Sequence, residues 1–187
     1  MKNIAIFASG EGTNAQHIID HFKLSDKIKI ALIVSNRSTA NVLERAKKSE
    51  IATLVIDRPS FYESDKTIEQ LKTKKIDFIV LAGFLWIIPE NLIKAFPNKI
   101  INIHPALLPK YGGKGMFGMN VHQAVIEAKD KQSGISIHYV NEKYDEGKMI
   151  SQHTCTLSEN ETAESLAKKI HELEHAHFPK VIEGLLQ

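Results

Sequence analysis

The stretch Ile4-Ala5-Ile6-Phe7-Ala8-Ser9-Gly10-Glu11-Gly12-Thr13-Asn14 joins an uninterrupted apolar run to a glycine-rich turn. Such a run is typical of a strand that is buried on both faces, as in parallel sheets. After the turn, apolar residues recur at helical spacing, at Ala15, Ile18, Ile19 and Phe22. The order of strand, glycine turn and helix predicts the first βα unit of a parallel α/β sheet.

The same alternation continues outward from this unit to residue 104. Apolar runs predict further strands at 28–34, 52–56 and 77–83, and a last one that ends at His104. Amphipathic segments between them predict helices at 40–49, at about 62–73 and at 89–94. Strands that alternate with helices through short connections favour a doubly wound, mostly parallel, twisted sheet in three layers, with a Rossmann-like N-terminal half.

The pattern changes after residue 105. Residues 109–118 are rich in glycine and have no periodicity, which predicts a loop. Residues 121–128 form a helical pattern, and the alternating runs 133–140 and 148–157 predict an antiparallel hairpin near the C-terminal end. A long amphipathic helix follows, from Thr162 to about Glu183, with Thr162 or Asn160 as its N-cap. We expect a single domain over residues 1–187.

Composition restricts the class of protein. The chain has 187 residues, is 43% hydrophobic and 25% charged, and carries a net charge of +2. It lacks the long basic runs that mark nucleic-acid binding, so we expect no such partner. The lone Cys155 cannot form an internal disulfide, and the apolar run at Ile4–Ala8 is too short for a signal peptide or a membrane span. We expect a cytoplasmic enzyme with no membrane partner.

The turn Gly10–Asn14 is a candidate anion site, because N–H groups of a glycine-rich turn and of a helix N-terminus bind phosphate. Residues 10–15 also match the dinucleotide pattern G-x-G-x-x-A. The next strand ends without the acidic residue that binds ribose, although Arg37 suits a 2′-phosphate. Tyr139 and Lys143 match the Tyr-x-x-x-Lys pair of short-chain dehydrogenases. They fall at the end of a predicted strand, however, and not on the helix that this pair requires. Phosphate binding is favoured, and a reductase that uses a nucleotide cofactor is an alternative.

A second motif, His171-Glu172-Leu173-Glu174-His175, is a literal H-E-x-x-H in the last predicted helix. Two histidines four residues apart can bind zinc, with Glu172 as the base. The residues after His175 do not supply the third protein ligand that a zinc hydrolase needs. A solvated helix face that partly contacts substrate is therefore favoured, and we expect no metal.

A polar pair closes the strand that ends at His104. Asn102 and His104 fall on one face because strand side chains alternate, and prolines stop the strand directly afterwards. Asp145 lies further on, in the turn Tyr144-Asp145-Glu146-Gly147. An amide, an imidazole and a carboxylate can together perform acid–base chemistry with oxyanion support. We interpret five other histidines as structural: His17, His21, His122, His138 and His153. His138 is the least clear of these, because it points toward the same hairpin.

These motifs resemble the folate-dependent formyltransferases. The matching segments are 9–14, 81–84, 101–109, 134–138, 144–147 and Glu174-His175. The segment Asn102-Ile103-His104-Pro105-Ala106-Leu107-Leu108-Pro109 is specific to that group, and the start at Ser9–Asn14 narrows it to the phosphoribosylglycinamide formyltransferases. A chain of this length leaves no room for the extra domains of the methionyl-tRNA and deformylase branches.

The resemblance implies direct transfer of the formyl group of 10-formyltetrahydrofolate to the amine of glycinamide ribonucleotide, in purine synthesis and without a metal. It implies that His104 is the acid–base residue, that Asn102 hydrogen-bonds the formyl oxygen, and that Asp145 orients His104, raises its pKa and relays the amine proton through water. Residues up to about 100 would form the phosphate-binding half, and residues from about 101 the folate and catalytic half. The protein is expected to be a monomer or a weak homodimer.

The resemblance also implies the binding residues. The ribonucleotide would contact Gly12, Thr13, Asn14, His171 and Glu174. The folate would contact Leu85, Trp86, Ile87, Ile88, Asn102, Val140, Asn141, Glu142, Lys143 and Tyr144. Trp86 departs from the arginine or polar residue of relatives, Arg58 is a candidate replacement for a ligand-contacting arginine, and the loop after Lys110 is a candidate lid.

Overall fold

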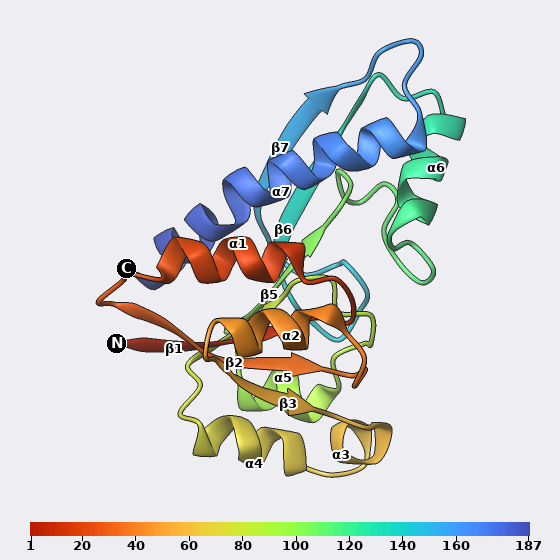
Figure 1. Cartoon of the computed structure of the whole chain (residues 1–187). Coiled ribbons are helices and arrows are strands. Elements are labelled where there is room, and N and C mark those ends of the chain that lie inside the picture. Colours follow the sequence, from red (N-terminus) through yellow and green to blue (C-terminus); the bar gives the residue numbers. More distant parts are fainter.

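Seven strands form one sheet in the order β3-β2-β1-β4-β5-β6-β7 in the computed structural model, which describes residues 1–187 (Figure 1). The first five strands along the chain pair in parallel, β6 is antiparallel to β5, and β7 is antiparallel to β6. Their bounds are β1 Lys2–Phe7, β2 Ile28–Ser35, β3 Ala52–Val55, β4 Phe78–Leu81, β5 Ile100–His104, β6 Gln132–Tyr139 and β7 Met149–Thr156. The predicted sheet, with its antiparallel hairpin near the C-terminal end, is confirmed.

Helices cover both faces of the sheet and give the three predicted layers. On one face lie α1 (Thr13–Phe22), α2 (Asn41–Lys48) and α7 (Ala163–Leu186), with α1 and α7 side by side (Figure 1). On the other lie α3 (Arg58–Tyr62), α4 (Lys66–Thr73) and α5 (Glu90–Ala95). The short α6 (Met119–Glu127) packs against α7.

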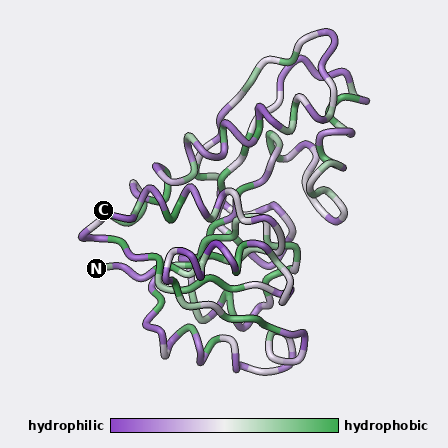
Figure 2. Tube along the Cα trace, in the orientation of Figure 1, coloured by the Kyte–Doolittle hydropathy of each residue, from purple (hydrophilic) through white to green (hydrophobic).

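Strand β1 shows why the sheet lies in the middle. Ile4 and Ile6 pack into the core beneath α1 and α7, whereas Ala5 and Phe7 pack into the core beneath α3, α4 and α5. All four side chains are fully buried because alternate residues point to opposite faces, each of which helices cover. Figure 2 shows the apolar residues concentrated in these inner strands, with hydrophilic residues along the helices outside.

One predicted helix is two helices in the structure. The pattern at about 62–73 predicts a single helix, but α3 ends at Tyr62 and α4 begins at Lys66. Helix α3 starts earlier than predicted because the Asp57 carboxylate caps it, accepting a hydrogen bond from the Ser60 N–H at 2.9 Å. The periodicity alone does not reveal this cap.

The last helix follows the prediction closely. Thr162 is its N-cap, and the Thr162 hydroxyl accepts a hydrogen bond from the Ser165 N–H at 3.2 Å. Leu166, Ile170 and Phe178 lie on its buried face. This packing brings residues of the C-terminal helix to the start of α1. None of the helices combines the length and the apolar composition that crossing a membrane requires.

Candidate active site

A cleft of about 440 Å³ opens at the carboxyl edge of the parallel strands. The loops after β1 and β4 border it, and these two strands are neighbours at the point where the strand order reverses. Ligands of open α/β sheets bind at such a point, because the two loops diverge there. The end of β5, the loop segment 113–118 with the start of α6, the turn after β6 and one face of α7 complete the walls.

The cleft brings together nearly all of the predicted site residues. Those that line it are Gly12, Thr13, Asn14, Leu85, Trp86, Ile87, Ile88, Asn102, His104, Val140, Asn141, Lys143, Tyr144, Asp145, His171 and Glu174. Glu142 does not line the cleft. It lies in the exposed turn between β6 and β7, where its carboxylate stays solvated. The individual roles of these residues stay predictions.

The centre of the site is a polar face shared by two antiparallel strands. Asn102 lies opposite His138, and His104 lies opposite Ser136, while the alternate isoleucines of both strands face the core beneath α7. His104 and His138 are buried, with exposed fractions of 4% and 2%. The predicted placement of Asn102 and His104 on one strand face is confirmed.

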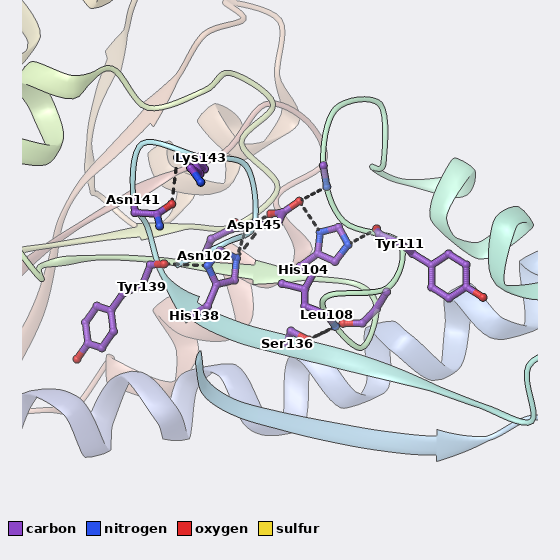
Figure 3. A network of polar contacts seen from close by, with 12 residues as sticks. Asn102, His104, Leu108, Tyr111, Ser136, His138, Tyr139, Asn141, Lys143 and Asp145 are labelled. Carbon is purple, nitrogen blue, oxygen red and sulfur yellow. Dashed lines mark hydrogen bonds and ion pairs between the residues drawn. The ribbon is translucent and has the colours of Figure 1, made fainter. Parts of the chain in front are cut away.

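Asp145 lies between the two histidines (Figure 3). Its Oδ2 is 3.6 Å from Nδ1 of His104, and its Oδ1 is 3.6 Å from Nε2 of His138. Oδ2 also accepts a hydrogen bond from the Gly113 N–H at 3.0 Å. Burial acts to raise the pKa of Asp145, but the hydrogen bond from Gly113 and the nearby imidazoles of His138 and His104 outweigh it and hold the pKa below its usual value.

Two backbone carbonyls determine where the imidazoles carry their protons. Nε2 of His104 lies 2.7 Å from the Tyr111 carbonyl, and Nδ1 of His138 lies 2.8 Å from the Tyr139 carbonyl. A carbonyl can only accept, so both of these nitrogens carry a proton. His138 Nε2 then accepts a hydrogen bond from the Asn102 amide at 3.2 Å, which orients that amide toward Asp145.

The position of Asp145 depends on a close approach of backbones in its turn. A Cβ on Gly147 would lie 1.6 Å from the Tyr139 carbonyl oxygen, so only glycine fits there. Asp145 itself has a positive φ of 54°, a conformation that aspartate tolerates better than most residues. The predicted Tyr-Asp-Glu-Gly turn is thus what carries the carboxylate back over β5.

The pKa of His104 differs from the expectation. The resemblance implies that Asp145 raises it, and the carboxylate does act in that direction. Burial of the ring is the larger effect, however, and it lowers the pKa of His104 below its usual value. The imidazole is therefore neutral at pH 7 in the free protein, with Nδ1 able to receive a proton.

A second buried pair joins the start of α1 to α7. The Asn14 side-chain amide donates a hydrogen bond to the Glu174 carboxylate at 2.8 Å. Glu174 is only 6% exposed, and burial raises the pKa of its carboxyl to about 7. Gly12 precedes this pair with a positive φ of 71°, and its Cβ would clash with Val42, so the turn requires glycine there.

Glu174 gives the protein a measurable pH dependence of stability. Its pKa is about 7 in the folded protein against an ordinary 4.5, so its contribution is fully present below pH 4.5 and is lost as the pH rises through 7. Relative to Glu174→Gln, the wild type should lose roughly 3 kcal/mol of unfolding free energy between pH 4 and 8, measured by urea denaturation. Glu172→Gln, which removes an exposed carboxylate of the same helix, should leave this dependence intact. If the unfolding free energies of wild type and Glu174→Gln varied with pH in parallel, the raised pKa of Glu174 would be contradicted.

The loop after β4 forms the apolar wall of the cleft. Ser9 ties it to the glycine-rich turn, because its hydroxyl accepts a hydrogen bond from the Leu85 N–H at 2.9 Å. Trp86 packs against Tyr62, and the Arg58 guanidinium lies 5.2 Å from the Trp86 ring centroid, within cation–π range. Arg58 does not line the cleft, so in the free protein it supports Trp86 instead of contacting the site.

Several residues at the cleft were missed in the sequence. His138 and His122 were interpreted as structural, yet both line the cleft, and burial lowers the pKa of His122 to about 4. Tyr111 and Gly113 were assigned only to a loop, although their backbone groups contact His104 and Asp145. The alternation of β6 carried a signal for His138, since it shares a face with Ser136 opposite the polar face of β5.

The H-E-x-x-H motif forms no metal site in the structure. His175 stacks on His17 with ring centroids 3.7 Å apart, and the rings of His171 and His175 lie 6.1 Å apart. No group of three or more potential ligands lies close enough to hold a metal ion. Glu174 and His171 of this motif instead face the cleft.

Comparison with known proteins decides the family. The sequence model described as formyl transferase matches residues 2–182. This chain belongs to the formyl transferase family. Its antiparallel β6 and the Asn102–His104 strand end are therefore parts of a formyl transferase fold, as the motifs predict.

Individual relatives agree over the whole chain. The phosphoribosylglycinamide formyltransferase of Bacillus subtilis is 37% identical over 192 residues, which cover 100% of this chain and 95% of that protein. The chloroplastic phosphoribosylglycinamide formyltransferase of Arabidopsis thaliana is 38% identical over 194 residues, and this chain spans 66% of its length. A crystal structure of phosphoribosylglycinamide formyltransferase from Bacillus halodurans has a TM-score of 0.89 and 38% identity, covering 100% of this chain and 96% of that one.

Proposed function

We propose that this formyl transferase transfers the formyl group of 10-formyltetrahydrofolate to the amine of glycinamide ribonucleotide, in purine synthesis. One observation carries the proposal. The buried His104–Asp145 pair lies between the turn Gly12–Asn14, which we call the phosphate cradle, and the apolar wall at residues 85–88. The relatives named for this reaction support it. The nucleotide-dependent reductase and the zinc hydrolase have no comparable support.

The two ligands would enter from opposite walls. The ribonucleotide phosphate accepts hydrogen bonds from the backbone N–H groups of Gly12, Thr13 and Asn14. Helix α1, which begins here, has no acidic residue in its first turn that would repel the phosphate. His171 and Glu174 lie on the same side, and an ionised Glu174 holds the glycinamide amine. The pterin lies along the backbone of residues 85–88 and of the turn 140–144. The division at about residue 100 into phosphate-binding and folate-binding halves is part of this proposal.

The reaction needs one proton to leave the amine and one to reach N10 of the folate. The amine nitrogen attacks the formyl carbon, and the Asn102 amide stabilises the oxyanion by exchanging its long 3.4 Å contact to Asp145 for the formyl oxygen. Asp145 accepts the amine proton through water and passes it to the unprotonated Nδ1 of His104, which lies 3.6 Å from Oδ2. His104, whose Nε2–H is bonded to Tyr111, then delivers this proton from Nδ1 to N10 as the C–N bond breaks.

We further propose that the protein acts in the cytoplasm as a monomer or weak homodimer, with two small-molecule ligands and no metal. Its net charge of +2 gives little electrostatic attraction for nucleic acid.

The activity is tested by incubating the protein with glycinamide ribonucleotide and 10-formyl-5,8-dideazafolate and following release of the deformylated folate. We expect turnover with the ribonucleotide and little with the same molecule lacking its phosphate, because the Gly12–Asn14 cradle would be empty. No turnover with the ribonucleotide would exclude the proposal, and NADPH binding in a titration would favour the reductase.

A further inference from the structure

The turn Tyr111–Gly113 holds both members of the His104–Asp145 pair. Its first residue accepts the His104 Nε2–H on a backbone carbonyl at 2.7 Å, and its last donates a backbone N–H to Asp145 Oδ2 at 3.0 Å (Figure 3). Both contacts come from the main chain. The geometry of the pair therefore depends on the backbone conformation of this turn.

That conformation is not one that a tyrosine adopts unaided. Tyr111 has a positive φ of 57°, in the left-handed region that non-glycine residues avoid. Such a residue persists only where surrounding contacts determine it. Ser136 of β6 supplies contacts of this kind to the residues that precede Tyr111. Its hydroxyl accepts a hydrogen bond from the Leu108 N–H at 2.9 Å and donates one to the Ala106 carbonyl at 2.6 Å.

The contact that holds Tyr111 lies outside the cleft. The Tyr111 hydroxyl donates a 2.8 Å hydrogen bond to Oδ2 of Asp130, in the connection between α6 and β6. The Lys110 ammonium bonds the same carboxylate at 3.1 and 3.2 Å. The hydrogen bonds from Tyr111 and Lys110 lower the pKa of Asp130, so the carboxylate is ionised and the contacts are charge-assisted.

We propose that Asp130 is a positioning residue of this enzyme, acting through Tyr111 to fix His104 as its Nε2–H tautomer beside Asp145. Asp130 does not line the cleft and contacts no group assigned to either ligand. With the Tyr111 carbonyl in place, Nδ1 of His104 keeps a lone pair for proton transfer. Without it, the Asp145 carboxylate, 3.6 Å from Nδ1, draws the proton to that nitrogen.

The decisive variants each change one polar group. Tyr111→Phe removes only the hydroxyl, and Asp130→Ala removes the acceptor. Asp130→Asn retains an oxygen that accepts from Tyr111, and Lys110→Ala removes an exposed cation alone, as a matched control. Imidazole ¹⁵N NMR of the free protein reports the His104 tautomer. The kinetic arm rests on the proposed function, whereas the NMR arm needs no substrate.

We expect Tyr111→Phe and Asp130→Ala to move neutral His104 from Nε2–H toward Nδ1–H. Their kcat for formyl transfer should fall on the order of tenfold, with KM for both substrates within about twofold, because placement changes and binding does not. Asp130→Asn should restore most of kcat and the wild-type tautomer, and Lys110→Ala should stay within about twofold of wild type.

An unchanged His104 tautomer in Tyr111→Phe would overturn the inference, including when the variant melts at a lower temperature, because that is what a purely structural contact gives. Should Asp130→Ala fail to fold, Tyr111→Phe still decides. A wild-type protein without transferase activity would refute the proposed function, while the NMR comparison would still test the role of Asp130.

Discussion

Replacing His104 by alanine is expected to lower kcat for formyl transfer by a factor of roughly 10² to 10⁴, the usual contribution of a positioned acid–base group. The leaving N10 then has no proton donor within reach, and Asp145 loses the imidazole 3.6 Å away. KM should change little, since the Gly12–Asn14 cradle and the apolar wall at 85–88 remain. Steady-state kinetics with each substrate varied in turn measures both parameters.

His21→Ala is the matched control for this experiment. His21 lies in the last turn of α1, where it pairs with Glu183 of α7; it is partly exposed and does not line the cleft, so its loss should leave kcat unchanged. His104→Asn fills more of the buried space than alanine and guards against a collapse of the site. Near-normal kcat in both His104 variants would remove this residue from the mechanism.

Asp145→Asn is expected to reduce kcat by roughly 10² to 10³, although the side chain keeps its size. An amide carries no negative charge, so it cannot stabilise a protonated His104, whose Nδ1 lies 3.6 Å from the carboxylate. It also cannot accept the amine proton. Single-turnover rates measured with both ligands saturating isolate this loss from any change in binding.

Glu146→Gln gives the matched comparison, because it neutralises the neighbouring carboxylate of the same turn, which is exposed and pairs only with Lys143. Its rate should equal that of wild type. In the double variant His104→Ala/Asp145→Asn the two losses should be far from additive, because the residues act as a unit. Additive losses would mean that Asp145 works independently of His104.

Most of the fold could be read from local patterns. The apolar run at Ile4–Ala8, the glycine turn after it and the 3.6-residue spacing in α1 each specify one element, and period-two alternation placed Asn102 and His104 on one face. The single helix predicted at 62–73 was wrong because the Asp57 cap starts one helix early, and a second then begins at Lys66.

The site itself was only partly predictable. The predicted catalytic and binding residues were identified one by one, and the cleft collects all of them except Glu142 and the candidate Arg58. The sequence did not reveal that His138 contacts both Asn102 and Asp145. It also did not reveal that burial outweighs the effect of Asp145 and lowers the pKa of His104. These properties depend on desolvation, which is set by everything that packs around a group.

By itself, the sequence determined the order and type of nearly all of the elements and the family, and it predicted most of the residues that line the cleft, because these depend on spacing along the chain. Only the tertiary structure decided which of those residues meet. Asn14 reaches Glu174 across 160 positions because α7 packs on α1, and Asp130 reaches His104 through a strained Tyr111 backbone. Such contacts follow from sheet register and helix packing, which act between distant segments and leave no local periodicity to read.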